Sequence, residues 1–359
     1  MKLALFERPA AGGGVRAGVV TESGVVDVSP ATERLEAHSP QDLMTKIIDG
    51  FDALRPVFER LIAGSQPLPI ESVRIRPPLP RPGKFLNCIS NYWEHAQREP
   101  RPLNMFLKSS DSVVGDGDTI VLPPLTASPF FDGPGPYVFQ HEAELGLVIR
   151  GPAKDVKQAD WRRAVFGCTG VIDVSARVEG RMSWRQGSWM GKSFDTFGPI
   201  GPFITTLDEI GDPNQLRIRF FNNGELYHDY VTDDMEHKVP QLVEFASSIM
   251  TLHSGDIIAC GTNHEGLGPL QDGEVVELEI EKVGRMRLKV KDPLKRKWER
   301  SVYMGPGATH QEVVRMRREA QARGEPEPQG GWQNWVPEGW RGGAQGEGGR
   351  GRREEGAAR

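Results

Sequence analysis

Residues 141–150 read HEAELGLVIR and place Glu142 and Glu144 two positions apart in a mostly apolar, strand-like stretch. Side chains at positions i and i+2 of a β-strand emerge on the same face, with their Cα atoms roughly 7 Å apart. Two carboxylates at that spacing repel each other, while the opposite face of the strand carries Leu145 and Leu147. The pattern predicts a largely buried strand whose acidic pair lies close to a positive charge.

The source of that positive charge has two interpretations. One is a nearby Arg or Lys beside a solvated strand face, and the other is a metal cation. A second apolar stretch, GVIDVSAR at 170–177, supplies a third carboxylate at Asp173, and Arg177 after it is expected to have a structural role near that strand end. Carboxylate oxygens suit Mg²⁺, Mn²⁺ or Ca²⁺ better than zinc or copper. The three acids are therefore candidate ligands of a divalent cation.

The rest of the chain divides into three parts. Residues 1–76 combine short alternating runs, a glycine-rich turn and a stretch of helical spacing, which predicts a small α+β domain. A proline-rich stretch, 77–84, is the expected boundary. Residues 84–293 form the main domain, and the segment 294–359 is a C-terminal extension that we expect to be largely irregular or disordered, because it carries few aliphatic residues.

The main domain carries most of the strand signals. VVELEIE at 275–281 and MRLKVKD at 286–292 alternate apolar and charged residues, which predicts a hairpin with one face in the core. One helix is expected from Pro240 through Leu252, with an apolar side that includes Ile249. Short strands and many Gly/Pro turns fill the remainder. The predicted fold class is α+β and β-rich.

Composition narrows the class of protein further. The net charge of −5 gives no indication of nucleic-acid binding. No run approaches 18 apolar residues and the N-terminus does not resemble a signal peptide, so we expect a cytoplasmic protein with no membrane partner. Cys88, Cys168 and Cys260 are odd in number and widely spaced, which favours reduced, buried thiols over disulfides or a zinc site.

A family resemblance rests on six blocks in a fixed order. The blocks are CISNYWEHAQRE (88–99), HEAELGLVI (141–149), GVIDVSAR (170–177), GKSFDTFGPIGPF (191–203), FNNGELYHDYVTDDM (221–235) and SGDIIACGT (254–262). Together they resemble the fumarylacetoacetate hydrolase family, which includes acylpyruvases and oxaloacetate decarboxylases. The resemblance spans roughly residues 84–292 and implies a β-rich roll around a metal site, a small N-terminal domain as in longer members, and a homodimer.

The resemblance implies roles for five residues of these blocks. Glu142, Glu144 and Asp173 match the metal carboxylates, with Mg²⁺ as the expected cofactor and Mn²⁺ or Ca²⁺ as alternatives. Lys192 matches the active-site lysine, which would neutralise a substrate carboxylate or a developing enolate. His95 matches the catalytic histidine and would act as general base.

The surroundings of His95 depart from the family pattern. The family pairs this histidine with a glutamate three residues later, whereas Arg98 stands there and Glu99 lies one place further on. Residues four apart share a helix face, but Pro100 disfavours helical geometry at the residue before it. Glu99 is the expected partner of His95, and Glu94 is the second candidate.

Four further residues are expected to line the substrate pocket. Lys108 and Gln186 come from segments that would face the site, and Thr262 keeps the family's substrate-binding threonine. The polar sequence after Thr262 replaces the usual proline, which predicts a changed distal pocket. His264 in that sequence is a pocket residue that would serve either as a second base or as a hydrogen-bonded loop histidine.

The expected function is metal-dependent hydrolysis of a C–C bond in a 1,3-diketo acid such as an acylpyruvate. Decarboxylation and isomerisation of a 2-keto acid are alternatives, because the same metal site would stabilise the same enolate. Hydration is a further alternative, distinguished by the addition of water without chain shortening. The displaced Glu99 leaves a third hypothesis open, in which the chain is a catalytically degraded metal-binding or scaffold protein.

Overall fold

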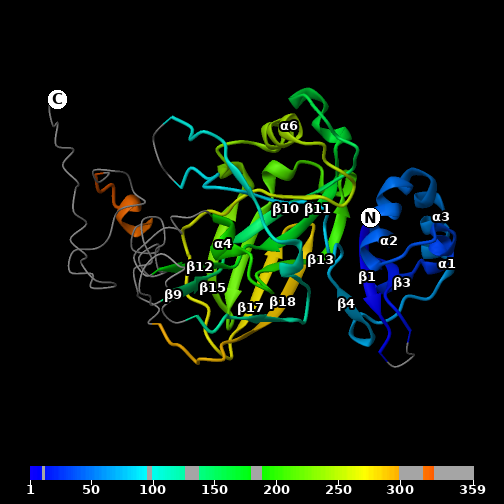
Figure 1. The fold of residues 1–359 in the computed structure, drawn as a ribbon, viewed down its shortest axis with the longest axis horizontal. Coiled ribbons are helices and arrows are strands. Elements are labelled where there is room, and N and C mark those ends of the chain that lie inside the picture. The colour runs from blue at the N-terminus through cyan, green and yellow to red at the C-terminus, as the bar shows by residue number, and fades with distance from the viewer. Residues whose placement is uncertain (10–12, 95–98, 126–136, 179–187, 299–317, 327–359) are drawn as a thin grey trace, which may run out of the picture.

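The computed structural model describes six stretches of the chain, namely residues 1–9, 13–94, 99–125, 137–178, 188–298 and 318–326. Two β-sheets form the body of the molecule (Figure 1). The large sheet contains β1 (Lys2–Glu7), β2 (Arg16–Thr21), β3 (Gly24–Asp27), β4 (Arg74–Arg76), β5 (Phe85–Cys88), β6 (Met105–Leu107), β7 (Val113–Val114), β10 (Ala143–Ile149), β11 (Val165–Ile172), β13 (Gly198–Thr206) and β16 (Ile257–Ala259). Nine of these follow the order β3-β2-β1-β13-β11-β10-β16-β5-β6, with β4 beside β1 and β7 beside β13.

The second sheet contains the predicted hairpin. Its strands are β8 (Thr119–Val121), β14 (Arg217–Asn222), β15 (Glu225–Val231), β17 (Val275–Ile280) and β18 (Gly284–Lys291), in the order β15-β14-β17-β18-β8. Strands β17 and β18 pair antiparallel, with Leu278 opposite Met286. Their alternate apolar residues are buried, which confirms the hairpin and the face predicted from its alternation.

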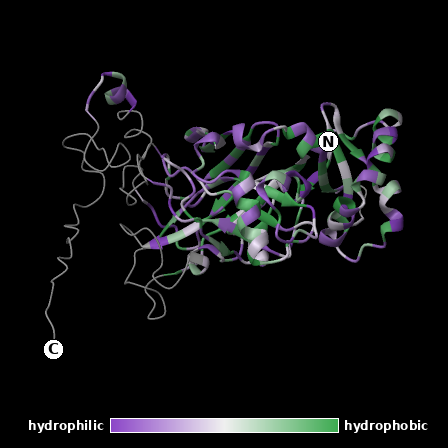
Figure 2. Ribbon diagram, turned by 90° about the horizontal axis from the view of Figure 1, so that it is seen from above, coloured by the Kyte–Doolittle hydropathy of each residue, from purple (hydrophilic) through white to green (hydrophobic). Residues whose placement is uncertain are grey.

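The main hydrophobic core lies between the two sheets. Leu145 and Cys168 of the large sheet belong to the same buried cluster as Phe220 and Leu288 of the small one. Figure 2 shows hydrophobic residues following the strands through the body of the molecule. This β-rich α+β architecture confirms the predicted fold class, and the three cysteines are free and buried as expected.

The N-terminal helices cover the other face of the large sheet. They are α1 (Ser29–Thr32), α2 (Pro40–Asp49) and α3 (Phe51–Gly64). The ring of Phe51 meets Phe166 of β11 edge-on at 4.9 Å between centroids, and Val148 of β10 joins the same cluster. Strand β1 also pairs directly with β13, with Leu3 opposite Ile204. The proline-rich boundary at 77–84 therefore separates two parts of one continuous sheet.

The remaining helices are short. They are α4 (Ser188–Lys192), α5 (Leu207–Ile210) and α6 (Val239–Ile249). Helix α6 confirms the helix expected from Pro240, but it ends at Ile249 rather than at Leu252. The side chain of Ile249, expected on the apolar side, is 61% exposed. No helix in the described stretches has the length and apolar character that a membrane crossing requires. Single 3₁₀ turns occupy Glu33–Leu35, Ile70–Ser72, Ser110–Ser112, Gln158–Arg163, Pro213–Gln215 and Thr232–Asp234.

The structure corrects the strand predicted at residues 141–150, because His141 and Glu142 lie outside it, in a break between two shorter strands. β9 (Tyr137–Gln140) ends before His141, and β10 begins at Ala143. The neighbouring chain breaks at the same level, between β11 and β12 (Ser175–Val178), so β9 and β12 leave the large sheet together as a separate pair. The backbone N–H of Asp173 donates to the carbonyl of Glu142 at 2.9 Å across the break. This paired interruption brings two acidic residues together at the edge of the core.

Candidate metal and active site

Three carboxylates converge where these strands break. Glu142 lies just before β10, Glu144 lies within it, and Asp173 directly follows β11. All three side chains are buried, and one oxygen from each lies within 4.8 Å of the others. The register of β10 against β11, with Ala143 opposite Ile172, places the acids side by side. The structure thus assembles the acidic cluster that the sequence predicted.

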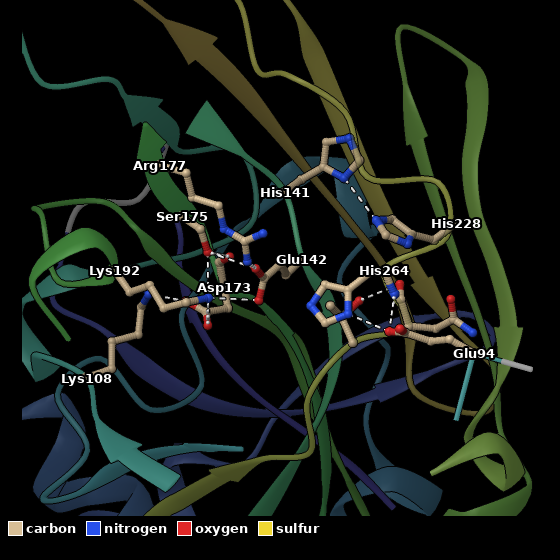
Figure 3. Close-up of polar contacts among 12 residues, drawn as sticks. Glu94, Lys108, His141, Glu142, Asp173, Ser175, Arg177, Lys192, His228 and His264 are labelled. Atoms are coloured by element: carbon tan, nitrogen blue, oxygen red, sulfur yellow. Dashed lines mark hydrogen bonds and ion pairs between the residues drawn. The ribbon is translucent and has the colours of Figure 1, made fainter. Parts of the chain in front are cut away.

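The buried Lys108 and the partly buried Lys192 contact the same cluster (Figure 3). The Nζ atom of Lys192 donates to Oε2 of Glu142 at 2.8 Å, to Oδ2 of Asp173 at 2.7 Å and to Oγ of Ser175 at 2.6 Å. The Nζ atom of Lys108 lies 2.6 Å from Oδ1 of Asp173. Both lysines therefore lie in the site, where the sequence placed them.

Arg177 supplies a further positive charge. Its guanidinium donates to Oε1 of Glu142, the oxygen that also accepts from Oγ of Ser175 at 3.2 Å. Burial acts to raise the pKa of Glu142, but the charges of Lys192 and Arg177 outweigh it and hold that pKa well below its ordinary value. Glu142 is consequently an anion with both oxygens engaged by donors.

Glu144 is the least compensated of the three acids. Its Oε2 accepts a hydrogen bond from the backbone N–H of Gly261 at 2.8 Å, while Oε1 is buried with no hydrogen-bond partner among the described residues. Burial, and then repulsion from Asp173 and Glu142, raises the pKa of Glu144 well above its ordinary value. An added cation would relieve both the repulsion and the unpaired oxygen, so this donor set fits a divalent metal ion.

The donor chemistry limits the choice of metal. Glu142, Glu144 and Asp173 offer carboxylate oxygens alone, and no histidine or cysteine belongs to this cluster within the described stretches. Hard oxygen ligands of this kind favour Mg²⁺, Mn²⁺ or Ca²⁺. The site is therefore a divalent-metal site of the oxygen-donor class.

The loop after β16 closes one side of the site. Gly261 holds Glu144, and the next residue, Thr262, is buried, with its hydroxyl donating to the carbonyl of Asn263 at 3.2 Å. The hydroxyl of Tyr230 lies 3.5 Å from that of Thr262. This places Thr262 beside the carboxylates, whereas Tyr230 is a neighbour that the sequence prediction did not include.

A second polar pair lies next to the cluster. Oε1 of Glu94 accepts from the backbone N–H of His264 at 2.9 Å and also contacts Nδ1 of the same histidine. Figure 3 shows the ring of His264 between Glu94 and Glu142. Burial acts to raise the pKa of Glu94, but its contacts with His264 lower it below the ordinary value. Of the two interpretations of His264, the structure shows a histidine held by a carboxylate at the site.

Two predicted residues, His95 and Gln186, lie outside the described residues. Glu99 is exposed, and its predicted pairing with His95 stays a prediction. In the sequence, Glu94 was only the second candidate partner of His95. Its observed partner, His264, is 170 positions away, and no local pattern connects the two residues.

The sequence and the fold of the chain resemble those of known proteins. Residues 85–291 match the family described as Fumarylacetoacetate (FAA) hydrolase C-terminal. The maleylpyruvate hydrolase of Aquipseudomonas alcaligenes is 32% identical over 77% of this chain and 96% of that protein. An oxaloacetate tautomerase of Bos taurus is 32% identical over 79% of this chain and 90% of its own. The crystal structure of maleylpyruvate hydrolase from Sphingobium sp. SYK-6, in complex with manganese(II) and pyruvate, matches with a TM-score of 0.69 at 32% identity, covering 81% of this chain and 99% of that one.

Proposed function

Since the chain belongs to the fumarylacetoacetate hydrolase family, we propose that it is a metal-dependent hydrolase that cleaves a carbon–carbon bond in a 1,3-diketo acid. The observation that carries this proposal is the buried cluster of three carboxylates with two lysines against it. The two maleylpyruvate hydrolases among its relatives favour a substrate that releases a small 2-keto acid.

The metal and the lysines would bind different parts of such a substrate. A divalent cation held by Glu142, Glu144 and Asp173 would supply a Lewis acid that polarises a keto group and stabilises an enolate. Lys192, which is partly buried, and Lys108, which is buried, present ammonium groups to the same space. An anionic substrate entering there would exchange their contacts with protein carboxylates for contacts with its own carboxylate, which fixes its orientation.

The hydrolytic step requires a base, and the family resemblance assigns that role to His95. His95 would take a proton from a water molecule that attacks the distal carbonyl carbon. A C–O bond forms, the adjacent C–C bond breaks, and its electron pair remains on the 2-keto acid fragment as an enolate. Protonation of that enolate carbon then completes the products, a carboxylic acid and a 2-keto acid.

Keto–enol tautomerisation is the second candidate function. The oxaloacetate tautomerase of Bos taurus is as similar to this chain as the bacterial maleylpyruvate hydrolase. Tautomerisation needs the same enolate stabilisation but no attacking water, so the carboxylate and lysine cluster would serve it equally well. Decarboxylation of a 2-keto acid shares this requirement, whereas a hydratase would add water without shortening the chain of the substrate. We further propose that the protein is a homodimer and that it is located in the cytoplasm.

The test is product analysis with a panel of acylpyruvates, maleylpyruvate and oxaloacetate in the presence of Mg²⁺ or Mn²⁺. We expect metal-dependent chain shortening that EDTA abolishes and that Lys192→Met reduces at least 100-fold, while the exposed-site variant Lys157→Met retains full activity. Enol consumption without chain shortening would replace hydrolysis by tautomerisation. Metal binding with no turnover of any compound would instead support a non-catalytic metal-binding protein.

A further inference from the structure

A carboxylate–histidine pair faces the carboxylate cluster from the side opposite the lysines (Figure 3). Glu94 and His264 are 7% and 9% exposed, and the carboxylate of Glu94 engages both the backbone N–H and Nδ1 of His264. In Figure 3 the other ring nitrogen, Nε2, lies on the side of the ring nearer Glu142.

This contact determines which nitrogen of His264 is available. A carboxylate that accepts a hydrogen bond from Nδ1–H keeps the proton of the neutral ring on that atom, so Nε2 carries the lone pair. Glu94 remains ionised because its pKa is lowered by His264 despite burial. The same division of labour, with a buried carboxylate orienting a histidine base, operates in catalytic triads.

The pair is held in place by a second set of contacts. The backbone N–H of Glu94 donates to Oδ2 of Asp234 at 3.2 Å, and the side-chain amide of Asn263 donates to the same oxygen at 3.0 Å. Asp234 therefore holds both sides of the contact. It binds Glu94 through the backbone of that residue, and it binds the segment of His264 through the neighbouring Asn263. A rigid arrangement of this kind is what a proton-transfer group requires.

We propose that His264 is a catalytic acid–base residue of this site and that Glu94 is its positioning residue. The inference rests on the proposed function, because it assigns the group that protonates the enolate. Nε2 takes a proton from the carbon next to the keto group, the C–H electron pair becomes part of the enolate, and the imidazolium returns a proton to the same carbon in reverse. His264 therefore handles the proton on carbon, and the proposed task of His95 is confined to activating water.

Proton exchange on a simple 2-keto acid separates these two tasks. We would incubate the protein with pyruvate and Mg²⁺ in D₂O and follow loss of the methyl signal by ¹H NMR. The wild type is expected to exchange these protons, and His264→Asn to slow exchange at least 100-fold with the Kd for pyruvate unchanged within about threefold. The exposed histidine variant His253→Asn serves as the matched control, and His95→Ala is expected to lose cleavage while keeping exchange.

Two further measurements guard against a merely structural effect of the substitution. Added imidazole should restore exchange to His264→Ala, because it can occupy the space of the missing ring. Glu94→Gln should slow exchange about tenfold without weakening pyruvate binding, and Glu94→Asp should recover part of the loss. Long-range ¹H–¹⁵N spectra of the metal-free protein should show His264 protonated on Nδ1 in the wild type and a mixed tautomer in Glu94→Gln.

The outcomes distinguish this inference from the function on which it rests. Exchange and cleavage by the wild type, with exchange retained in His264→Asn, would overturn the role of His264 and leave the hydrolase proposal standing. Exchange lost in His95→Ala instead would transfer the carbon acid–base role to His95. A wild-type protein that binds Mg²⁺ and pyruvate but neither cleaves nor exchanges would overturn the proposed function and this inference with it.

Discussion

The ammonium of Lys108 lies 2.6 Å from Oδ1 of Asp173, and both side chains are buried. Burial lowers the pKa of Lys108, while the charge of Asp173 acts in the opposite direction. Each group therefore relies on the other, because neither has water to solvate its charge. Replacing either member of this ion pair should therefore lower the free energy of unfolding of the protein.

Lys108→Met should destabilise the metal-free protein. The substitution removes one partner of a buried ion pair and leaves Oδ1 of Asp173 uncompensated, which costs about 3 kcal/mol. Urea unfolding in EDTA measures the change, and Lys157→Met, whose side chain is 73% exposed, is the control that should stay within about 0.5 kcal/mol of wild type. Equal unfolding midpoints for the two variants would contradict the structural role of this pair.

Metal binding should stabilise the wild type through Glu144. At a Mn²⁺ concentration 100 times its Kd, the free energy of unfolding should rise by about 2.7 kcal/mol, and EDTA should reverse the gain. Glu144→Gln removes one of the three carboxylates, so most of this gain should disappear. Without metal the variant should be no less stable than wild type, because burial and repulsion already disfavour the charge of Glu144.

The matched control for that experiment is Glu22→Gln, an exposed position far along the chain from the site. Its thermal shift with Mn²⁺ should equal that of wild type in scanning calorimetry. A full shift retained by Glu144→Gln would show that the cation binds elsewhere.

Stability should fall as the pH decreases from about 6.5 to 4 because of His228. Burial lowers the pKa of His228 from 6.5 to about 4, so between these values the unfolded chain takes up a proton that the folded protein does not. The contribution is complete above pH 6.5 and decreases by about 1.4 kcal/mol per pH unit, to a total loss of about 3 kcal/mol at pH 4.

Denaturant titrations of wild type and His228→Gln across this pH range isolate the effect. Gln keeps a polar group that can bond the ring of His141, the 3.1 Å neighbour of His228, but it does not titrate. The fall in the free energy of unfolding that His228 causes between pH 6.5 and 4 should be absent in His228→Gln. It should persist in His38→Gln, which alters an exposed histidine. Parallel pH profiles for wild type and His228→Gln would remove His228 as the source.

Gly266→Ala should be far more damaging than Gly224→Ala. Both glycines have positive φ, +87° and +81°, so each alanine pays a backbone cost of roughly 1 kcal/mol. At Gly266 the new Cβ would lie 1.9 Å from the carbonyl oxygen of Tyr227, whereas at Gly224 nothing lies within 4 Å. The loop that carries Thr262 and His264 must therefore shift, and its stability loss should exceed that of Gly224→Ala by at least about 2 kcal/mol.

Unfolding midpoints and Mn²⁺ affinity check this pair of variants together. Gly266→Ala should weaken metal binding as well, because the same loop holds Glu144 through Gly261. An equal, small loss for both glycines would mean that the loop after β16 adjusts without strain.

Local patterns were sufficient for the elements and for the acidic pair. The alternation in 275–291 depends only on neighbouring residues, and the structure forms that hairpin with the predicted face inward. Glu142 and Glu144 were candidates because ten residues of sequence show two acids on one face of an apolar stretch, and such a pair requires a nearby positive charge. The apolar stretch at 170–177 added Asp173, and the family resemblance gave Lys192 its expected role.

The interruption at His141 and the pairing of Glu94 with His264 were beyond such patterns. Apart from His141, the apolar face of residues 138–150 continues through the interruption, and this local pattern does not show that β9 and β12 form a separate sheet.

The sequence by itself determined the hairpin at 275–291, the helix near Pro240 and the acidic candidates, because hydrophobic periodicity and turn residues act over a few positions. Only the tertiary structure decided which charges meet. Register across β10 and β11 brings Asp173 to Glu142, and a contact across 170 positions brings Glu94 to His264. Such contacts follow from packing of the whole chain, in which a buried charge is retained only where the fold supplies its partner.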